Sequence, residues 1–435
     1  MMNKDFAVLK GWEARTVHPD ASPLDRLGRL MLLVGCATLI PALACSIALM
    51  NIGLAVALTG AVLSRAPLHR LPGFWWGLAL TAWIGLGAVI GAIHGVPVNA
   101  TAADGSLTTE LSHRLQFEGQ AYTWIAVLLT AYAWSDSTRR GLLLTLLAVV
   151  LASASLLAAA QVAIGHGPDG PFRIAAGGER LASGWFGEHL TFGFIVGLTA
   201  IAFWHGAGTA APWARWLGRF ASCGSLAICM ARSAVLGGVL GLATAWSWLS
   251  WRRVVAGAAA VMLAGAAAIG GLAVLKPEKY DKLMRAEDGR WAIWTTAIAV
   301  VGEAPWFGAQ GQNGYRAAHR RLHQVVHPGQ VPEFPKGAPH AHNSFLALAA
   351  ERGIPAVLLY LGLLGALLRA VWRSGDPAAR SLALGLITAA LIAGQFERLA
   401  GDVESGFALF TLLGLAFALA SQARRPDQLV EDVKR

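Results

Sequence analysis

Two histidines stand where the longest polar loop of the chain meets an apolar segment, in the sequence PHAHNSFLALAAERGIP. The second of them, His342, is a candidate general base, since an imidazole can accept a proton near neutral pH. Asn343 and Ser344 follow it, and both are preferred N-cap residues of a helix. His340 could orient His342 or contact a substrate. The plainer alternative is a pair of histidines that only face a helix start.

Three arginines lie beside apolar segments, where a guanidinium could bind an anion. Arg232 stands in CMARSAVLGG between two apolar segments, and Arg290 opens a predicted helix in DGRWAIWTTAIAVVGE. Arg180, in GGERLASGWFGEHL, precedes a further apolar segment. The N–H groups of a helix start favour anions, and an arginine adds a planar donor that fits phosphate in a bidentate way. Each of the three also has a simpler interpretation as a surface or snorkelling arginine.

A metal site is the alternative use of the histidines. His319 and His323 are four residues apart on one predicted helix face, as zinc ligands can be. Their segment also holds three arginines that would repel a cation: Arg316, Arg320 and Arg321. The sequence contains no HExxH motif and no Asp-x-Asp pair. We therefore predict no metal and no cofactor, and we expect Arg316 and Arg320 to support binding of an anionic lipid or a phosphorylated sugar, although a solvated helix face is equally plausible.

The elements that position these residues are predicted to be membrane-spanning helices. Of the 435 residues, 55% are hydrophobic and 14% are charged, against about 25% charged residues in soluble proteins. The apolar residues form blocks of about 20, the length that crosses a hydrocarbon core as a helix. The chain is thus expected to be an all-α polytopic membrane protein. Twelve spans are predicted, at 27–44, 45–63, 74–95, 120–134, 141–165, 189–207, 213–230, 233–250, 254–275, 354–372, 379–396 and 404–421.

The placement of basic residues predicts the orientation of these spans. The short connections SDSTRR and WRR carry arginines, as cytoplasmic connections do, whereas long loops are exempt from this rule. Both termini are then cytoplasmic, and the net charge of +10 reflects topology rather than nucleic-acid binding. Three regions follow: residues 1–275 with nine spans, a large periplasmic loop at 276–341, and residues 342–435 with three spans and a cytoplasmic tail. Within the loop we expect short helices near 277–286, 289–302 and 313–325.

The order of Arg232, Arg290 and the His342-Asn343 pair resembles the O-antigen ligase superfamily, which also includes O-antigen polymerases and protein O-oligosaccharyltransferases. The most specific likeness is to the WaaL-type ligases, whose histidine motif matches His342, Asn343, nine further residues and Gly353. The residue that closes the motif differs, because Ala356 stands in place of Gly, Thr or Tyr.

Both arginines match this family pattern as well. Arg232 falls on the arginine of a Ser-Arg signature, with Ala231 in place of serine. Arg290 falls on an arginine that precedes a Pro-x-x-Gly turn, here residues 305–308.

The resemblance implies a GT-C-like glycosyltransferase of the bacterial inner membrane, with its active site facing the periplasm. Such enzymes move a glycan from undecaprenyl pyrophosphate to an acceptor without a nucleotide or a metal. Arg232, Arg290 and Arg180 would then stabilise pyrophosphate, while His342 would deprotonate the acceptor hydroxyl with inversion at the sugar. We favour a ligase that uses lipid A-core as acceptor. A protein oligosaccharyltransferase would carry extra C-terminal periplasmic sequence; a polymerase is the closest alternative, and a transporter lies outside this class.

Overall fold

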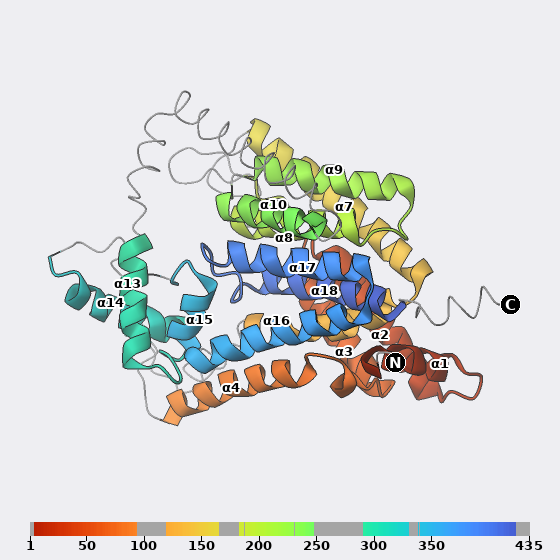
Figure 1. Cartoon of the computed structure of the whole chain (residues 1–435), viewed down its shortest axis with the longest axis horizontal. Coiled ribbons are helices and arrows are strands. Elements are labelled where there is room, and N and C mark those ends of the chain that lie inside the picture. The colour runs from red at the N-terminus through yellow and green to blue at the C-terminus, as the bar shows by residue number, and fades with distance from the viewer. Residues whose placement is uncertain are drawn as a thin grey trace.

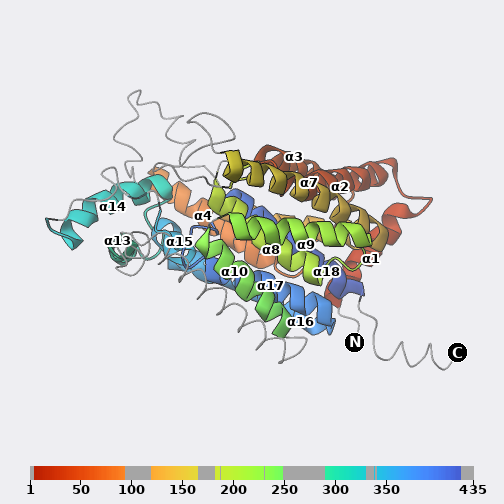
Figure 2. The ribbon, with the colours of Figure 1, turned by 90° about the horizontal axis from the view of Figure 1, so that it is seen from above.

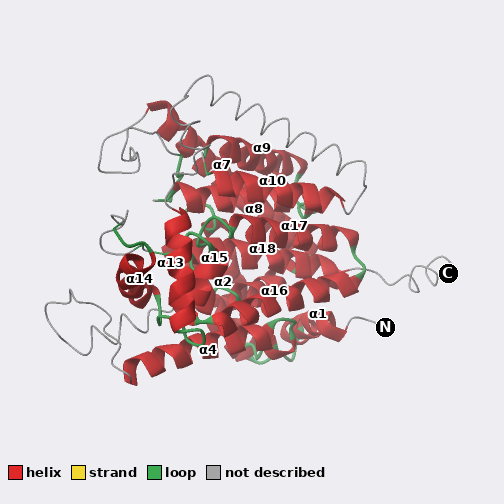
Figure 3. Ribbon diagram, turned by 60° about the vertical axis from the view of Figure 1, so that its left-hand side comes forward, coloured by secondary structure: helices red, strands yellow, loops and turns green. Residues whose placement is uncertain are grey.

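The computed structural model describes residues 4–93, 119–164, 182–186, 188–229, 231–247, 290–329, 338 and 340–422. In this part of the chain every regular element is a helix, and Figure 3 shows helices joined by loops. The α-helices are α1 (Lys4–Val17), α2 (Pro23–Ala42), α3 (Ile47–Leu63), α4 (Phe74–Ile93), α6 (Ile125–Trp134), α7 (Ser137–Ile164), α8 (His189–His205), α9 (Pro212–Ile228), α10 (Arg232–Ser247), α13 (Arg290–Glu303), α14 (Gln312–Val326), α15 (Ser344–Arg352), α16 (Ile354–Ser374), α17 (Pro377–Ala393) and α18 (Val403–Gln422).

The predicted spans agree with these helices. Each predicted span within the described residues overlaps a helix, while the span at 254–275 and the short helix at 277–286 lie outside them. Among the described residues, four helices are long and apolar enough to cross a membrane: α4, α7, α16 and α18. Shorter apolar helices, α3, α6, α8 and α17, lie among them. The helices are consistent with a polytopic membrane protein, and the count of twelve spans remains a prediction.

Helix α18 lies in the interior of the bundle. Nearly all of its residues from Ser405 to Ala420 are buried, on every face of the helix. It packs against α6, α8, α16 and α17. A helix that is apolar all round and buried all round belongs to the core rather than to the lipid boundary. The turn that precedes α18 is therefore held by the most enclosed part of the bundle.

Small residues allow close helix packing in two places. In the hairpin of α2 and α3, a Cβ added at Gly35 would lie 2.3 Å from the backbone nitrogen of Ala57. In the pair of α10 and α17, a Cβ at Gly237 would lie 2.7 Å from the backbone oxygen of Ala389. Such contacts let helix backbones approach closely where the hydrophobic effect gives no drive to associate.

The polar elements separate to the two ends of the bundle. Helices α13, α14 and α15 lie together at one end in Figures 1 and 2, and α1 lies at the other. Connections predicted to be cytoplasmic meet at the α1 end, where the Arg140 guanidinium donates to Thr209 Oγ1 at 3.1 Å and to Gln422 Oε1 at 2.9 Å. In the described part of the chain, the start of α7, the connection after α8 and the end of α18 thus lie together. Which end faces the periplasm remains a prediction.

Two short helices of the large loop have nearly the bounds that the sequence predicted. The expected helices near 289–302 and 313–325 correspond to α13 and α14. They pack on each other and on α15 through a small apolar cluster that includes Ile293, Val300 and Tyr315. The N-terminal helix α1 had not been expected, because its residues are too polar for a span.

Candidate functional site

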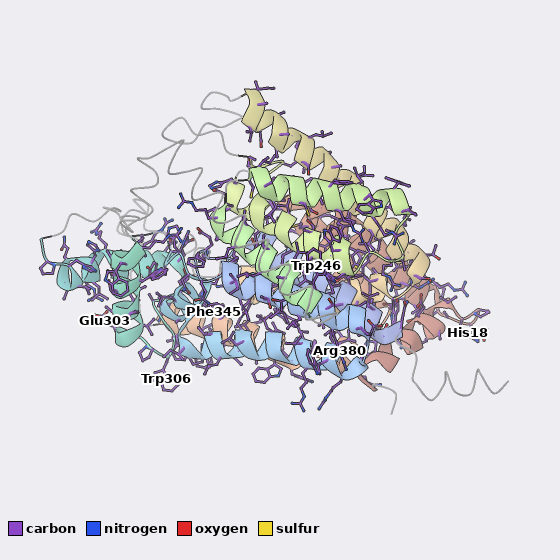
Figure 4. The ribbon with its side chains drawn as sticks, turned by 45° about the horizontal axis from the view of Figure 1, so that its top comes forward. His18, Trp246, Glu303, Trp306, Phe345 and Arg380 are labelled. Carbon is purple, nitrogen blue, oxygen red and sulfur yellow. The ribbon has the colours of Figure 1, made fainter. Side chains whose placement is uncertain are left out.

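The start of α15 fixes the backbone of the histidine pair. Asn343 is the N-cap residue: its Oδ1 accepts hydrogen bonds from the backbone N–H groups of Phe345 and Leu346, both at 3.0 Å. This confirms the capping expected from the sequence. His342, just before the cap, has φ +48°, in the left-handed region that is uncommon for residues other than glycine. In Figure 4, Phe345 lies at the same end of the molecule as Glu303 and Trp306, and His18 lies at the opposite end.

The turn after α17 is tied to the start of α15. The Ser344 backbone N–H donates to the carbonyl oxygen of Gly394 at 2.6 Å, and the Ser344 hydroxyl donates to that of Glu397 at 2.8 Å. The Asn343 amide donates to the backbone oxygen of Gln395 at 3.1 Å. These bonds place the side chain of Glu397 beside His342. Neither α15 nor α17 by itself would bring the two residues together.

The Glu397 carboxylate lies between the candidate base and a candidate anion-binding arginine. Its Oε2 lies 3.4 Å from His342 Nδ1, and its Oε1 lies 3.3 Å from Arg290 Nη2. The Glu397 side chain is 8% exposed, against 24% for His342 and 30% for Arg290. An ionised carboxylate can only accept hydrogen bonds. His342 therefore donates from Nδ1, and the lone pair needed for proton abstraction lies on Nε2.

Glu397 was not among the residues selected from the sequence. It belongs to an adjacent Glu-Arg pair in a short connection between two apolar segments, in the stretch QFERLAGD. Ionisable residues within membrane spans are costly and usually functional, and Glu397 stands close to the end of one predicted span. That signal was present, but the partner of Glu397 lies 55 residues away in the chain.

His340 lies against His342. Its Nδ1 accepts a hydrogen bond from the His342 backbone N–H at 3.2 Å, and the two ring centroids are 4.1 Å apart. Burial, with the nearby His342, Arg398 and Arg316, lowers the pKa of His340 to about 3. His340 is therefore neutral at pH 7 and supports the backbone of His342 as an acceptor.

The two glycines of the family pattern bring the two signature segments together. Gly353 has φ +87°, and a Cβ there would lie 1.8 Å from the backbone oxygen of Trp306. Gly308 has φ +59°, and the backbone N–H of Ile354 donates to the carbonyl of Pro305 at 2.8 Å. Glycine is required at both positions because φ is positive and because the neighbouring backbone lies too close for a Cβ. The Pro-x-x-Gly turn and the end of the histidine motif thus form one unit.

A buried ion pair secures the turn that carries Glu397. Arg398 donates to the Glu351 carboxylate from Nε at 2.9 Å and from Nη2 at 2.6 Å, a bidentate arrangement. The Glu351 side chain is 1% exposed and that of Arg398 is 13% exposed. Glu351 lies in the last turn of α15 and Arg398 follows Glu397, so this pair joins the end of α15 to the turn that carries Glu397.

Arg232 lies at the same end of the bundle as Glu397. It is the first residue of α10 and is exposed. Gly237 packs against Ala389 and Ala393, and Gly241 packs against Gly385, so α10 runs antiparallel to α17. The first turn of α10 therefore lies beside the end of α17. Within the described part of the chain, no ion pair joins Arg232 to Glu397 or to another acid.

The remaining arginine candidates lie on α14 or outside the residues that the structure describes. Arg316 and Arg320 are exposed on α14, and Arg316 lies within electrostatic range of His340. Their neighbour Arg321 donates from Nη1 to Glu303 at 3.0 Å on the outer face of α13. Arg180 lies outside the described residues.

The histidines of α14 are packing residues. His319 and His323 are 2% and 4% exposed, and their rings stack with centroids 5.8 Å apart. Burial, followed by the effects of His323 and His327, lowers the pKa of His319 to about 4. Among the residues that the structure describes, no group of three or more His, Cys, Asp and Glu side chains is arranged to hold a metal ion.

Comparison with known families matches part of the chain to a family model. A family model described as O-Antigen ligase matches residues 217–361, a range that includes Arg232, Arg290 and His342. The resemblance stated from those residues is thereby confirmed for the superfamily. No curated protein matches the chain. The match over these residues supports a membrane protein of the O-antigen ligase and polymerase type, and suggests an enzyme that transfers glycosyl groups. Glu397 lies beyond the matched range.

Proposed function

We propose that this chain, whose residues 217–361 belong to the O-antigen ligase superfamily, transfers O-antigen glycan from undecaprenyl pyrophosphate to lipid A-core oligosaccharide. The reaction would take place at the periplasmic face of the bacterial inner membrane. One observation carries the proposal: Glu397 contacts His342 Nδ1 at 3.4 Å and Arg290 at 3.3 Å. A base and a cationic group for pyrophosphate are thus held on one carboxylate.

The proposed reaction is a single displacement at the anomeric carbon. His342 Nε2 removes the proton from an acceptor sugar hydroxyl while the hydroxyl oxygen forms a bond to that carbon. The bond from the carbon to the pyrophosphate oxygen breaks, and its electron pair leaves with the pyrophosphate. Attack from the face opposite the leaving group inverts the anomeric configuration. The negative Glu397 stabilises the imidazolium that forms.

Arginines would stabilise the leaving group. The charge on the pyrophosphate increases as the glycosidic bond breaks, and a preorganised donor aimed at such charge contributes about 10² to 10³ in rate. Arg290 and Arg232 are assigned to this role, because both open helices at the end of the bundle where His342 lies. Arg180 is assigned to it from the family resemblance alone.

The remaining residues would support the substrates. Asn343 and His340 hold the backbone of His342. Arg316 and Arg320, exposed on α14, suit the phosphates of a lipid A-core acceptor.

A polymerase is the second candidate function, since it uses the same donor and differs in the acceptor. The test is a lipopolysaccharide gel of a deletion strain, with the lipid-linked polymer analysed alongside. A ligase predicts long glycan chains that stay on the lipid carrier. Lipopolysaccharide capped with single repeat units would instead identify a polymerase, and normal lipopolysaccharide with altered protein glycosylation would identify a protein O-oligosaccharyltransferase.

A further inference from the structure

The Glu397 carboxylate contacts two side chains, His342 and Arg290, and both interact with its negative charge. One oxygen contacts the imidazole of His342 and the other contacts the guanidinium of Arg290. The contact to Arg290 runs through one nitrogen at 3.3 Å, which is longer than a usual charge-assisted hydrogen bond. The Arg290 side chain is 30% exposed, so an anion from solvent or from the membrane surface can reach it.

We propose that Glu397 couples donor binding to activation of the acceptor. A pyrophosphate that binds Arg290 withdraws this guanidinium from Glu397, and the carboxylate then stabilises the protonated form of His342 alone. The inference rests on the proposed function, in which Arg290 binds pyrophosphate. It assigns Glu397 as a positioning residue that makes His342 a stronger base once the donor is bound.

The balance of charges gives the direction of this effect. While Arg290 shares the carboxylate, its positive charge offsets part of the field that Glu397 exerts on His342. A pyrophosphate group carries more negative charge than one carboxylate and accepts a guanidinium fork with two oxygens, so it competes well for Arg290. An opposite charge within about 4 to 6 Å favours the charged form of a titratable group.

The turn that carries Glu397 is built to stay in place when Arg290 leaves. The Glu397 carbonyl accepts from the Ser344 hydroxyl at 2.8 Å, and the neighbouring Arg398 forms a bidentate pair with Glu351. Glu397 therefore remains beside His342, and the rearrangement falls on the side chain of Arg290.

Other charged groups surround this site. His342, Arg398 and Arg316 act on His340, and Glu188 and Glu397 act on His189. These groups come from the histidine loop, the turn after α17, α14 and the start of α8, and they are present whether or not Arg290 contacts Glu397.

The experiment compares the full-length protein with its Glu397→Gln variant in lipid nanodiscs, using farnesyl pyrophosphate as the probe. Competition predicts that Glu397→Gln binds the probe several-fold more tightly than wild type while its rate of glycan transfer falls. If Glu397 had only a structural role, its replacement would weaken both probe binding and glycan transfer. Glu397→Asp keeps the charge and should recover part of the transfer rate. Glu303→Gln, which alters the exposed pair with Arg321, is the matched control and should change neither quantity.

The second readout is the titration of His342 by nitrogen-15 NMR, with the resonance assigned by its loss in His342→Ala. Farnesyl pyrophosphate should raise the titration midpoint in wild type and raise it by much less in Glu397→Gln. An equal rise in both proteins, or weaker probe binding by Glu397→Gln, would overturn the coupling and leave the proposed function standing. No probe binding by wild type would overturn both.

Discussion

The carboxylate of Glu397 lies 3.4 Å from Nδ1 of His342. Glu397 belongs to the turn after α17, 55 residues farther along the chain than His342. The contact favours the tautomer that carries the proton on Nδ1, which leaves the lone pair on Nε2. The same carboxylate lies 3.3 Å from Arg290, so the proposed base and the proposed pyrophosphate-binding arginine share one buried partner. The predictions below test the parts of this arrangement separately.

The arginines can be tested by substitution. Arg232→Ala and Arg290→Ala should each lower ligation by about 10² to 10³, because each removes a donor to the pyrophosphate. Lysine at either position should restore activity only in part, since it lacks the planar fork. The measurement is transfer by purified protein at equal abundance. Full activity of both alanine variants would remove the arginines from pyrophosphate binding.

The buried pair of Glu351 and Arg398 should matter for stability. Removing one member takes away the bidentate partner of a buried charge, and breaking a buried ion pair in this way costs about 3 to 5 kcal/mol. We therefore expect Glu351→Gln and Arg398→Gln to lower the thermal unfolding temperature markedly. The surface pair of Glu303 and Arg321 is the control, and its loss should have little effect. Equal small shifts for both pairs would contradict the anchoring role of Arg398.

Much of this region was predictable from the sequence because its signals are local. The helices α13 and α14 follow from apolar spacing, and the N-cap role of Asn343 follows from its residue type. The family pattern identified Arg290 and His342 in the same way. Their common partner was not predictable, because a contact across 55 residues depends on how the turn after α17 packs on α15. The ion pair of Glu351 and Arg398 was not predictable for the same reason, because the two residues are 47 positions apart in the chain.

Acid should destabilise the loop region. Burial lowers the pKa of His319 to about 4 and that of His340 to about 3, whereas an unfolded histidine titrates near 6.5. Between these values the unfolded chain binds more protons, so stability is full above about pH 6.5 and is lost as the pH falls. Each histidine can contribute about 2 to 3 kcal/mol of this loss by pH 4.5.

Thermal unfolding at pH 7 and at pH 4.5 measures this dependence. His319→Gln should flatten it, and His18→Gln, at an exposed position near the other end of the bundle, should leave it unchanged. A dependence that His319→Gln does not reduce would contradict the assignment.

The orientation of the chain can be tested by labelling single cysteines in intact cells. Positions 100, 175 and 330 should react with an impermeant reagent, because they fall in loops predicted to be periplasmic. Positions 137 and 376 should not react, since they begin α7 and precede α17 in connections predicted to be cytoplasmic. Reaction at the latter two would invert the topology and move the proposed site to the cytoplasmic side.

The central claim is that His342 removes the acceptor proton, and the most direct measurement is glycan transfer by purified His342→Ala with lipid-linked donor and lipid A-core acceptor. A general base contributes about 10² to 10⁴ in rate, so transfer should fall by that factor while donor binding stays close to wild type. His340→Ala should lose less, because His340 supports His342 through its backbone. EDTA should leave the wild-type rate unchanged. Undiminished transfer by His342→Ala would contradict the account and would assign acceptor activation to another group, with Glu188 and His189 the next residues to test.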